Sequence, residues 1–179
     1  MKKVFTLLLV SMLLLTGCAL FGSSPKDEVA KFLNNYKKNS ESVTKELDDY
    51  LQTQDLDEDT LEDYRKLYLK QYSNLKYEIK DEKIDGDTAL VEVQVTVYDY
   101  YKTDKEAGDY FTTNQSEFVD DDGDIDFSKY FEYKIKELLD TTDTVDYTLT
   151  LNLKKNNDMW EVEPLTNEEL MKLHGTYEY

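Results

Sequence analysis

The sequence predicts an α+β fold in which N-terminal helices pack on one face of a curved, about four-stranded antiparallel sheet. Apolar residues recur every three to four positions in the first part of the chain, which is the period of an amphipathic helix. From residue 75 onward the period changes to two, as in strands with one buried and one solvated face. Short turn signals separate these strands, and short connections favour antiparallel pairing.

Three short helices are expected before the sheet. Ser24, Pro25 and Asp27 give the first helix an N-cap, a proline at its first position and a capping-box acid. The acid-rich segment DLDEDT separates the second helix from the third. The apolar stripes of the three helices are Val29, Phe32, Leu33 and Tyr36; Val43, Leu47, Tyr50 and Leu51; and Leu61, Tyr64, Tyr68 and Tyr72.

Two hairpins supply the four strands. Leu75, Tyr77 and Ile79 alternate with charged residues, and Asp85-Gly86 gives the first hairpin its turn. The residues KKNND turn the second hairpin. The inward-facing residues of the remaining strands are Ala89, Val91, Val93, Val95 and Val97; Tyr147, Leu149, Leu151 and Leu153; and Trp160 and Val162.

Between the hairpins we expect an irregular acidic loop near residues 101–125, followed by a helix that Asp126 caps. The loop contains Gly108 and the segments TTNQS and DDDGD. The helix carries a stripe of Phe127, Tyr130, Phe131, Ile135, Leu138 and Leu139. After the second hairpin, Thr166 and Glu169 form another capping box for a short helix, and His174 is expected on the surface of a C-terminal tail.

The first twenty residues predict export. Lys2 and Lys3 precede an apolar run over residues 4–15, which are the charged and apolar regions of a secretory signal. Twelve helical residues span about 18 Å, which is short for about 30 Å of bilayer hydrocarbon. The run ends in Leu15-Thr16-Gly17-Cys18, which resembles the lipobox of bacterial lipoproteins.

This resemblance implies that a diacylglycerol is attached to the sulfur of Cys18 and that a signal peptide of residues 1–17 is removed. Residues 18–24 are then the lipidated cysteine with a short linker, and residues 25–179 form a single domain. The protein would be anchored in the cell membrane at its extracytoplasmic face, because two acyl chains are enough for stable attachment. An uncleaved anchor helix with an incidental cysteine is the alternative.

Composition excludes several classes of function. Cys18 is the only cysteine, so the domain has no disulfide framework, thiolate metal site or cysteine nucleophile. The 39 acidic and 21 basic residues give a net charge of −18, which becomes −20 when Lys2 and Lys3 leave with the signal peptide. Such a surface repels nucleic acid and anionic lipid headgroups. Binding to an envelope protein, or to a basic or cationic partner, is compatible with this charge.

No metal site is predicted. In an EF-hand, acidic ligands occupy positions 1, 3, 5 and 12 around a glycine at position 6. With Gly123 at position 6, Asp120 and Asp122 fall at positions 3 and 5, but Phe118 and Lys129 occupy positions 1 and 12. We therefore expect a solvated acidic loop, with a weak calcium site of another kind as the alternative.

No catalytic residue and no cofactor are predicted either. His174 is the only histidine, and no glycine-rich phosphate loop is present. The remaining enzymatic route is an aspartate base with tyrosine donors in an apolar pocket. The tyrosines on apolar stripes are Tyr50, Tyr64, Tyr68, Tyr77 and Tyr147, where filling the core is their ordinary role. The cluster VYDYYKTDKEAGDYF either covers the rim of the core or binds sugars or a partner, and we favour the first.

The segments GDTALVEVQVTVYD and TVDYTLTLNLKKNNDMWEVE resemble the NTF2-like, cystatin-like α+β fold of small Gram-positive bacterial lipoproteins of unknown function. The resemblance covers roughly residues 26–165 and implies a cone-shaped sheet. Its motifs are strand and turn patterns, so they indicate fold more than activity. The acidic stretch 101–125 departs from the family pattern and is interpreted as an insertion.

We therefore predict a lipid-anchored, extracytoplasmic lipoprotein that acts as a binding or interaction module in the cell envelope and is not an enzyme. The alternative is a protein with a small-ligand pocket, or a Tyr/Asp-based enzyme. The interior of the domain distinguishes them: a pocket of roughly 300 Å³ or more, with Tyr and Asp groups converging on it, favours a small-molecule site.

Overall fold

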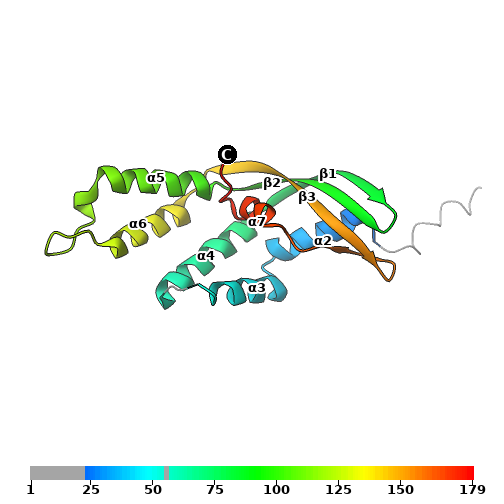
Figure 1. Ribbon diagram of the computed structural model, residues 1–179, viewed down its shortest axis with the longest axis horizontal. Helices are drawn as coiled ribbons and strands as arrows, with labels where there is room; N and C mark the ends of the chain where they lie inside the picture. The colour runs from blue at the N-terminus through cyan, green and yellow to red at the C-terminus, as the bar shows by residue number, and fades with distance from the viewer. Residues whose placement is uncertain (1–22, 55–56) are drawn as a thin grey trace, which may run out of the picture.

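The computed structural model describes residues 23–54 and 57–179 (Figure 1). The predicted signal peptide of residues 1–17 and the lipidated Cys18 lie outside these residues. In the described ranges the chain forms six α-helices and one antiparallel sheet with strand order β1-β2-β3-β4. The predicted α+β class, with a curved four-stranded antiparallel sheet, is therefore confirmed.

The three N-terminal helices occur where the apolar stripes place them. They are α2 (Pro25–Lys37), α3 (Glu41–Leu51) and α4 (Glu58–Asn74). The capping box predicted for α2 is present, since the Ser24 hydroxyl accepts the Asp27 N–H and the Asp27 carboxylate accepts the Ser24 N–H. The Asp57 carboxylate caps α4 by accepting the Thr60 N–H at 2.9 Å.

Four strands follow the predicted hairpins, with one shift in a turn. The strands are β1 (Lys76–Asp85), β2 (Thr88–Tyr98), β3 (Thr144–Asn156) and β4 (Met159–Val162). Asp85 pairs with Thr88, so the turn residues are Gly86 and Asp87 instead of the predicted Asp85 and Gly86. Gly86 has a φ of +59° there, a left-handed conformation that glycine adopts without a steric penalty.

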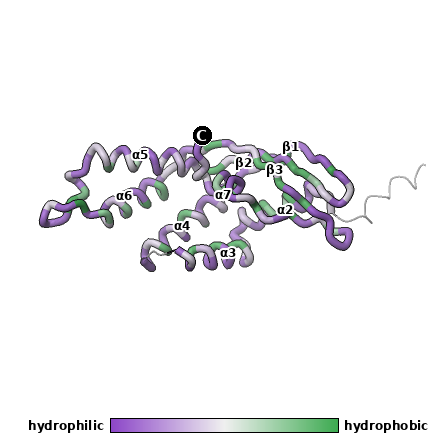
Figure 2. The backbone as a smooth tube through the Cα atoms, viewed as in Figure 1, coloured by the Kyte–Doolittle hydropathy of each residue, from purple (hydrophilic) through white to green (hydrophobic). Residues whose placement is uncertain are grey.

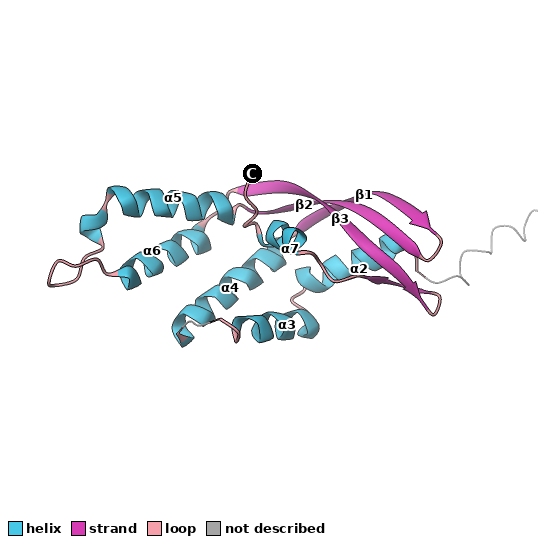
Figure 3. Ribbon diagram, viewed as in Figure 1, coloured by secondary structure: helices cyan, strands magenta, loops and turns pink. Residues whose placement is uncertain are grey.

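The sheet is buried on one face only. Hydrophobic and hydrophilic residues alternate along its strands in Figure 2. The buried residues of the inner face are Ala89, Val91, Val93, Val95 and Val97 of β2, Tyr147, Leu149, Leu151 and Leu153 of β3, and Trp160 of β4, and the predicted Val162 packs against them partly buried. The sheet arches over α2 and α7 (Asn167–His174) in Figure 3, and α4 also contacts it. Helix α3 packs on α2 and α4, further from the sheet.

The predicted acidic loop near residues 101–125 is largely helical, and that prediction is wrong. Residues Tyr100–Thr113 form helix α5, which Asp99 caps by accepting the Lys102 N–H at 3.0 Å. The buried side of α5 consists of Tyr100, Thr103 and Ala107. Two of these residues are small and weakly hydrophobic, which is why hydropathy alone does not show the helical period. The irregular part is limited to residues 114–126, including the 3₁₀ turn η1 (Gln115–Glu117).

Helices α5 and α6 (Phe127–Asp140) run antiparallel and project from one end of the sheet (Figure 1). The start of α5 and the C-terminal half of α6 pack on α4 through a second hydrophobic cluster, which consists of Leu67, Tyr100, Ile135 and Leu138. At their far end, Phe111 packs on Tyr130 with ring centroids 4.4 Å apart. The predicted cap of α6 is confirmed, since the Asp126 carboxylate accepts the Ser128 N–H.

The last helix, α7, returns the chain beneath the sheet. Its predicted capping box is present, with the Thr166 hydroxyl accepting the Glu169 N–H and the Glu169 carboxylate accepting the Thr166 N–H. Gly175 caps the helix just after its last residue, with a φ of +73°. Gly175 also accepts a hydrogen bond from the N–H of Tyr101, at the start of α5. Helix α7 also contacts β2, β3 and α4.

Candidate functional site

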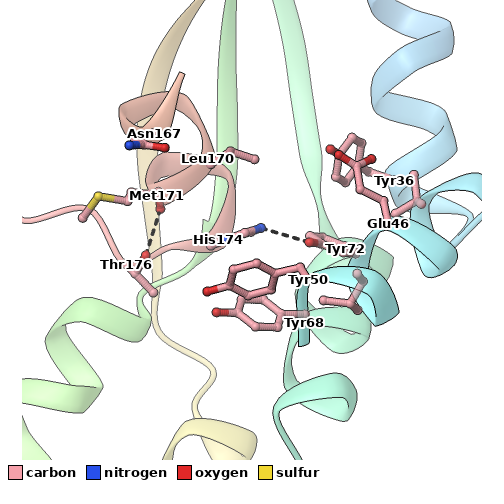
Figure 4. A pocket seen from close by; sticks show the side chains of 12 residues that line it. Tyr36, Glu46, Tyr50, Tyr68, Tyr72, Asn167, Leu170, Met171, His174 and Thr176 are labelled. Atoms are coloured by element: carbon pink, nitrogen blue, oxygen red, sulfur yellow. Dashed lines mark hydrogen bonds between the residues drawn. The ribbon is translucent and has the colours of Figure 1, made fainter. Parts of the chain in front are cut away.

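A cleft of about 420 Å³ lies between α3, α4 and α7 (Figure 4). Three stretches of chain that are distant in sequence meet there. The lining residues are Tyr36 of α2; Val43, Glu46, Leu47 and Tyr50 of α3; Tyr68 and Tyr72 of α4; and Asn167, Leu170, Met171, His174 and Thr176 in or just after α7. Most of this surface is aromatic or aliphatic, with few polar groups, as in ordinary small-molecule sites.

Helical spacing places these side chains on the walls of the cleft. Tyr68 and Tyr72 are four residues apart on α4 and therefore project from the same face of that helix. Glu46 and Tyr50 have the same spacing on α3. Both are exposed at the edge of the cleft, whereas Leu47 between them is buried. The α3 wall thus has an apolar floor and a polar rim.

The innermost polar contact joins α4 to α7. The Tyr72 hydroxyl lies 2.9 Å from Nε2 of His174, and the two rings point toward each other in Figure 4. Burial lowers the pKa of His174 to about 4, and burial raises the pKa of Tyr72 far above its usual value. Both groups are therefore neutral at pH 7. We assign the phenol as the donor, since it is the stronger acid of the two neutral groups, which places the imidazole proton on Nδ1.

Aromatic contacts hold this wall in place. The Tyr36 ring meets Tyr72 edge to face, with centroids 5.1 Å apart, and Tyr68 lies 4.7 Å from the His174 ring. Tyr68 and Tyr72 are stacked with centroids 6.4 Å apart. Such pairs contribute about 0.5–1.5 kcal/mol each beyond the burial of their area. The rings therefore form a continuous, pre-arranged surface.

Gln71 fixes the backbone that carries His174. Its Nε2 donates to the carbonyl of His174 at 2.8 Å and to the carbonyl of Tyr98 at 3.0 Å. Its Oε1 accepts the Tyr98 N–H at 2.8 Å. The side chain is buried with all of these bonds made, so it joins α4, β2 and the end of α7 at one point.

Electrostatically, the cleft is neutral inside and negative at its rim. Glu46 is the only acidic residue of the lining, and no lysine or arginine belongs to it. Burial, followed by the nearby Glu46 carboxylate, raises the pKa of Tyr36 to about 12. The same carboxylate also helps to raise the pKa of Tyr72. Glu46 therefore disfavours a negative charge on either hydroxyl.

The tyrosines singled out from the sequence do not gather at one place. Tyr50 and Tyr68 line the cleft. Tyr77 lies on β1 and donates to the Ala30 carbonyl at 3.3 Å, and Tyr147 lies on β3 and donates to the Tyr177 carbonyl at 2.9 Å. Tyr64 packs against both hydrophobic clusters. Core filling is thus the role of the last three, as expected.

Sequence reasoning missed the polar centre of the cleft. His174 was expected on the surface of a tail, but it is the last residue of α7 and is half-buried against Tyr72, so that prediction is wrong. The Thr166 capping box was the available signal, because the helix that it starts is long enough to include His174. Glu46 and Tyr72 carried no sequence signal for a role in a site.

The acidic loop and the tyrosine cluster both make contacts within the protein itself. Asp120 accepts the N–H groups of Asp122 and Asp124, and Gly123 has a φ of +89°. Among the described residues, no three His, Cys, Asp or Glu side chains are grouped as metal ligands would be. In the tyrosine cluster, Tyr98 stacks on the buried Tyr100, which supports the prediction that these rings cover the rim of the core.

Within the described ranges, no helix is both long and apolar enough to cross a bilayer. The sequence matches no protein-family model and no curated protein. Among solved structures, it is similar to the crystal structure of a "putative lipoprotein (ycdA)" from Bacillus subtilis subsp. subtilis str. 168, with 16% sequence identity and a TM-score of 0.44. The match covers 88% of this chain and 48% of that chain, so the chain spans about half the length of the Bacillus protein.

Proposed function

We propose that the protein is a membrane-anchored binding protein of the bacterial cell envelope, and that its α3–α4–α7 cleft binds a small organic molecule. The observation that carries this proposal is the cleft itself. Its volume of about 420 Å³ exceeds the roughly 300 Å³ at which small-molecule sites begin. Aromatic and aliphatic side chains form its walls, and few polar groups are available to orient a ligand.

Binding without catalysis fits the polar groups of the cleft. A general acid or base works best when its pKa lies near the working pH. The pKa of His174 is lowered to about 4 and that of Tyr72 is raised far above neutral, so His174 is a weak base and Tyr72 a weak acid at pH 7. The two side chains are also bonded to each other. We therefore assign this pair to holding the cleft in shape.

Anchoring and fold family complete the proposal. The lipobox-like Leu15-Thr16-Gly17-Cys18 supports attachment through Cys18 at the extracytoplasmic face. Helix α2 begins at Pro25, so a short linker separates the lipid from the domain. A curved sheet with helices on one face supports the NTF2-like assignment that the strand motifs suggest.

The anchor is tested by metabolic labelling with radioactive palmitate. Label should enter the wild-type chain and should be absent from Cys18→Ala, which removes the thiol that accepts the lipid. Equal labelling of the two chains would contradict attachment at Cys18.

Ligand binding is tested with His174 as a reporter. It is the only histidine, so an untagged full-length chain with isotopically labelled histidine gives NMR signals from the cleft alone. Members of a library of small aromatic and aliphatic fragments should shift these signals. Met171→Trp, which fills the cleft, should abolish the shifts, and Met159→Trp on β4 should retain them. Binding fragments that leave His174 unchanged would contradict the proposal.

We also propose a second candidate function, the docking of a basic protein segment between α4 and α6. A groove of about 460 Å³ there presents Phe131 and Ile135 among carboxylates of both helices. The acidic members of its lining are Asp57, Asp59, Asp63 and Glu132. Charge complementarity therefore favours a partner that combines lysine or arginine with apolar residues.

This second function is tested with a short peptide of alternating Lys and Leu residues. The peptide should bind the full-length chain, and Phe131→Ser should weaken binding at least about fivefold, because an apolar contact is lost. Phe127→Ser removes an exposed ring outside the groove and should have little effect. Equal binding of a peptide with Glu in place of Lys would show that the groove does not recognise basic segments.

A further inference from the structure

The α3–α4–α7 cleft is lined by one acidic residue and by no lysine or arginine. The acidic residue is Glu46, and His174 in the same lining is neutral at pH 7. The chain as a whole has a net charge of −18. An anionic ligand would meet repulsion both at a distance and at the rim, whereas a cation would be attracted at both stages.

The aromatic walls also favour a cation over a neutral ligand of the same shape. The faces of tyrosine rings carry negative electrostatic potential and attract ammonium groups within about 6 Å of the ring centroid. Tyr50 and Tyr68 both line the cleft, and burial, followed by the nearby Tyr50, raises the pKa of Tyr68 to about 12. Tyr50 is half exposed, so part of its ring is free to meet a ligand.

An inorganic cation does not suit this lining. Calcium takes six to eight oxygen ligands, and the cleft offers one carboxylate among rings and aliphatic side chains. A volume of about 420 Å³ is also far larger than a metal ion requires. The lining therefore fits a cation that carries apolar substituents.

We infer that the cleft selects a small organic cation, such as an amine or a quaternary ammonium compound, with Glu46 pairing with its charge and Tyr50, Tyr68 and Tyr72 contacting its apolar groups. This inference rests on the proposed function of the cleft as a small-molecule site. Glu46 lines the cleft from α3, and, after burial, its charge contributes to the raised pKa values of Tyr36 and Tyr72. The Glu46 carboxylate and the tyrosine rings therefore belong to the same site.

The test compares three probes of nearly the same shape. Choline carries a trimethylammonium group, 3,3-dimethylbutan-1-ol has a neutral tert-butyl group in its place, and 3,3-dimethylbutanoate adds a negative charge. Each is titrated into the untagged, histidine-labelled full-length chain in a non-ionic maltoside detergent, and the His174 signals report occupancy. Choline should bind about tenfold more tightly than the alcohol, and the carboxylate should bind most weakly.

Glu46→Gln separates the charge from the shape of the cleft. It should weaken choline binding about fivefold and leave binding of the neutral alcohol unchanged. Glu41→Gln is the matched control, because it removes the same charge from the exposed start of α3, outside the lining, and should leave both affinities unchanged.

The outcomes distinguish this inference from the function on which it rests. If the alcohol moves the His174 signals at equal or lower concentration than choline, the cation class is wrong and the small-molecule site stands. If choline binds more tightly but Glu46→Gln and Glu41→Gln reduce its affinity equally, overall charge and not Glu46 provides the preference, and the assigned role of Glu46 is overturned. If the fragment library also leaves His174 unmoved, both proposals fail.

Discussion

The environment of His174 differs from that of an exposed histidine. Its neutral imidazole is held by Tyr72 on one side and by the bond from Gln71 to its own carbonyl. Protonation would place a positive charge on a ring that burial largely removes from water. The pKa of about 4 expresses this cost.

The first prediction is a loss of stability in mild acid. The folded-state pKa of His174 is about 4 and the ordinary value is 6.5, so the unfolded chain binds the proton more tightly between these pH values. Stability is therefore complete above pH 6.5 and decreases as the pH falls toward 4. Between pH 7 and pH 5 the free energy of unfolding should fall by about 2 kcal/mol from this group. Urea unfolding at both pH values measures the loss.

The non-titrating variant His174→Gln should show a correspondingly smaller change between pH 7 and pH 5. Subtracting it from the wild type removes the contributions of the carboxylates. Direct NMR titration of the imidazole gives the same pKa without a variant. A titration midpoint near 6.5 would contradict the buried, neutral role of His174.

The second prediction concerns Gly175, which combines a left-handed backbone conformation with a lack of space for a side chain. Its φ is +73°, and a Cβ atom there would lie 2.0 Å from the Tyr98 carbonyl oxygen and 2.5 Å from Nε2 of Gln71. Gly175→Ala should therefore destabilise the protein by more than about 2 kcal/mol. Gly86→Ala is the matched control, because Gly86 has a φ of +59° but open space around it. It should cost only about 1 kcal/mol.

Thermal unfolding of both glycine variants, monitored by circular dichroism, gives the comparison. The difference between them isolates the close approach of α7 to β2 from the backbone strain that they share. Equal losses would mean that the end of α7 is not packed against Tyr98 as tightly as the structure shows.

At the scale of elements, the patterns that repeat most strictly were predicted correctly. Every second residue from Ala89 to Val97 is apolar, and that alternation leaves a single way to bury the strand. The caps at Ser24, Asp126 and Thr166 correctly identified helix starts. A capping side chain accepts a hydrogen bond from a backbone N–H only two or three residues further on, so the pattern can be recognised within a short stretch of sequence. Helix α5 was missed, because Thr103 and Ala107 pack without a strong hydropathy signal.

The third prediction tests α5 directly. Gly108 lies inside this helix, and a Cβ atom there would meet only the Tyr130 hydroxyl, at an ordinary 3.7 Å. Alanine has a higher helix propensity than glycine, so Gly108→Ala should raise the free energy of unfolding by about 0.5–1 kcal/mol. Urea unfolding at pH 7 measures the gain. No gain or a loss would favour the irregular loop that composition suggests for this stretch.

At the scale of the whole molecule, the sheet and the helices that pack on it were predictable from the sequence, whereas helix α5 and the cleft were not. Strand alternation and short turns specify an antiparallel sheet with helices on one face, whatever the surface residues are. The cleft instead depends on how far α3, near residue 50, lies from α7, near residue 174. Spacing within one helix carries no information about that distance. From the sequence alone, Tyr68 and Tyr72 are therefore interpreted as core residues, although they also line the cleft.

The last prediction follows from the net charge of −18, which is large for a chain of this length. Surface ion pairs such as Lys45–Asp49 and Lys66–Glu62 contribute about 0–1 kcal/mol each and weaken with salt. Repulsion among the excess carboxylates acts over the whole surface, and raising ionic strength from about 10 mM to about 150 mM shortens its range from about 30 Å to about 8 Å. Because the excess is one-sided, relief of repulsion should outweigh the weakened pairs.

The melting temperature should therefore rise by about 2–5 °C between these two ionic strengths, which corresponds to roughly 1 kcal/mol. Potassium chloride is the appropriate salt, because the inferred organic-cation site would confound ammonium salts. The double variant Asp121→Asn/Asp122→Asn, in the exposed loop after α5, lowers the excess charge and should show a smaller rise. A melting temperature that falls with salt would mean that ion pairs dominate, and the negative field invoked for attracting a cationic ligand would then be weaker than the sequence implies.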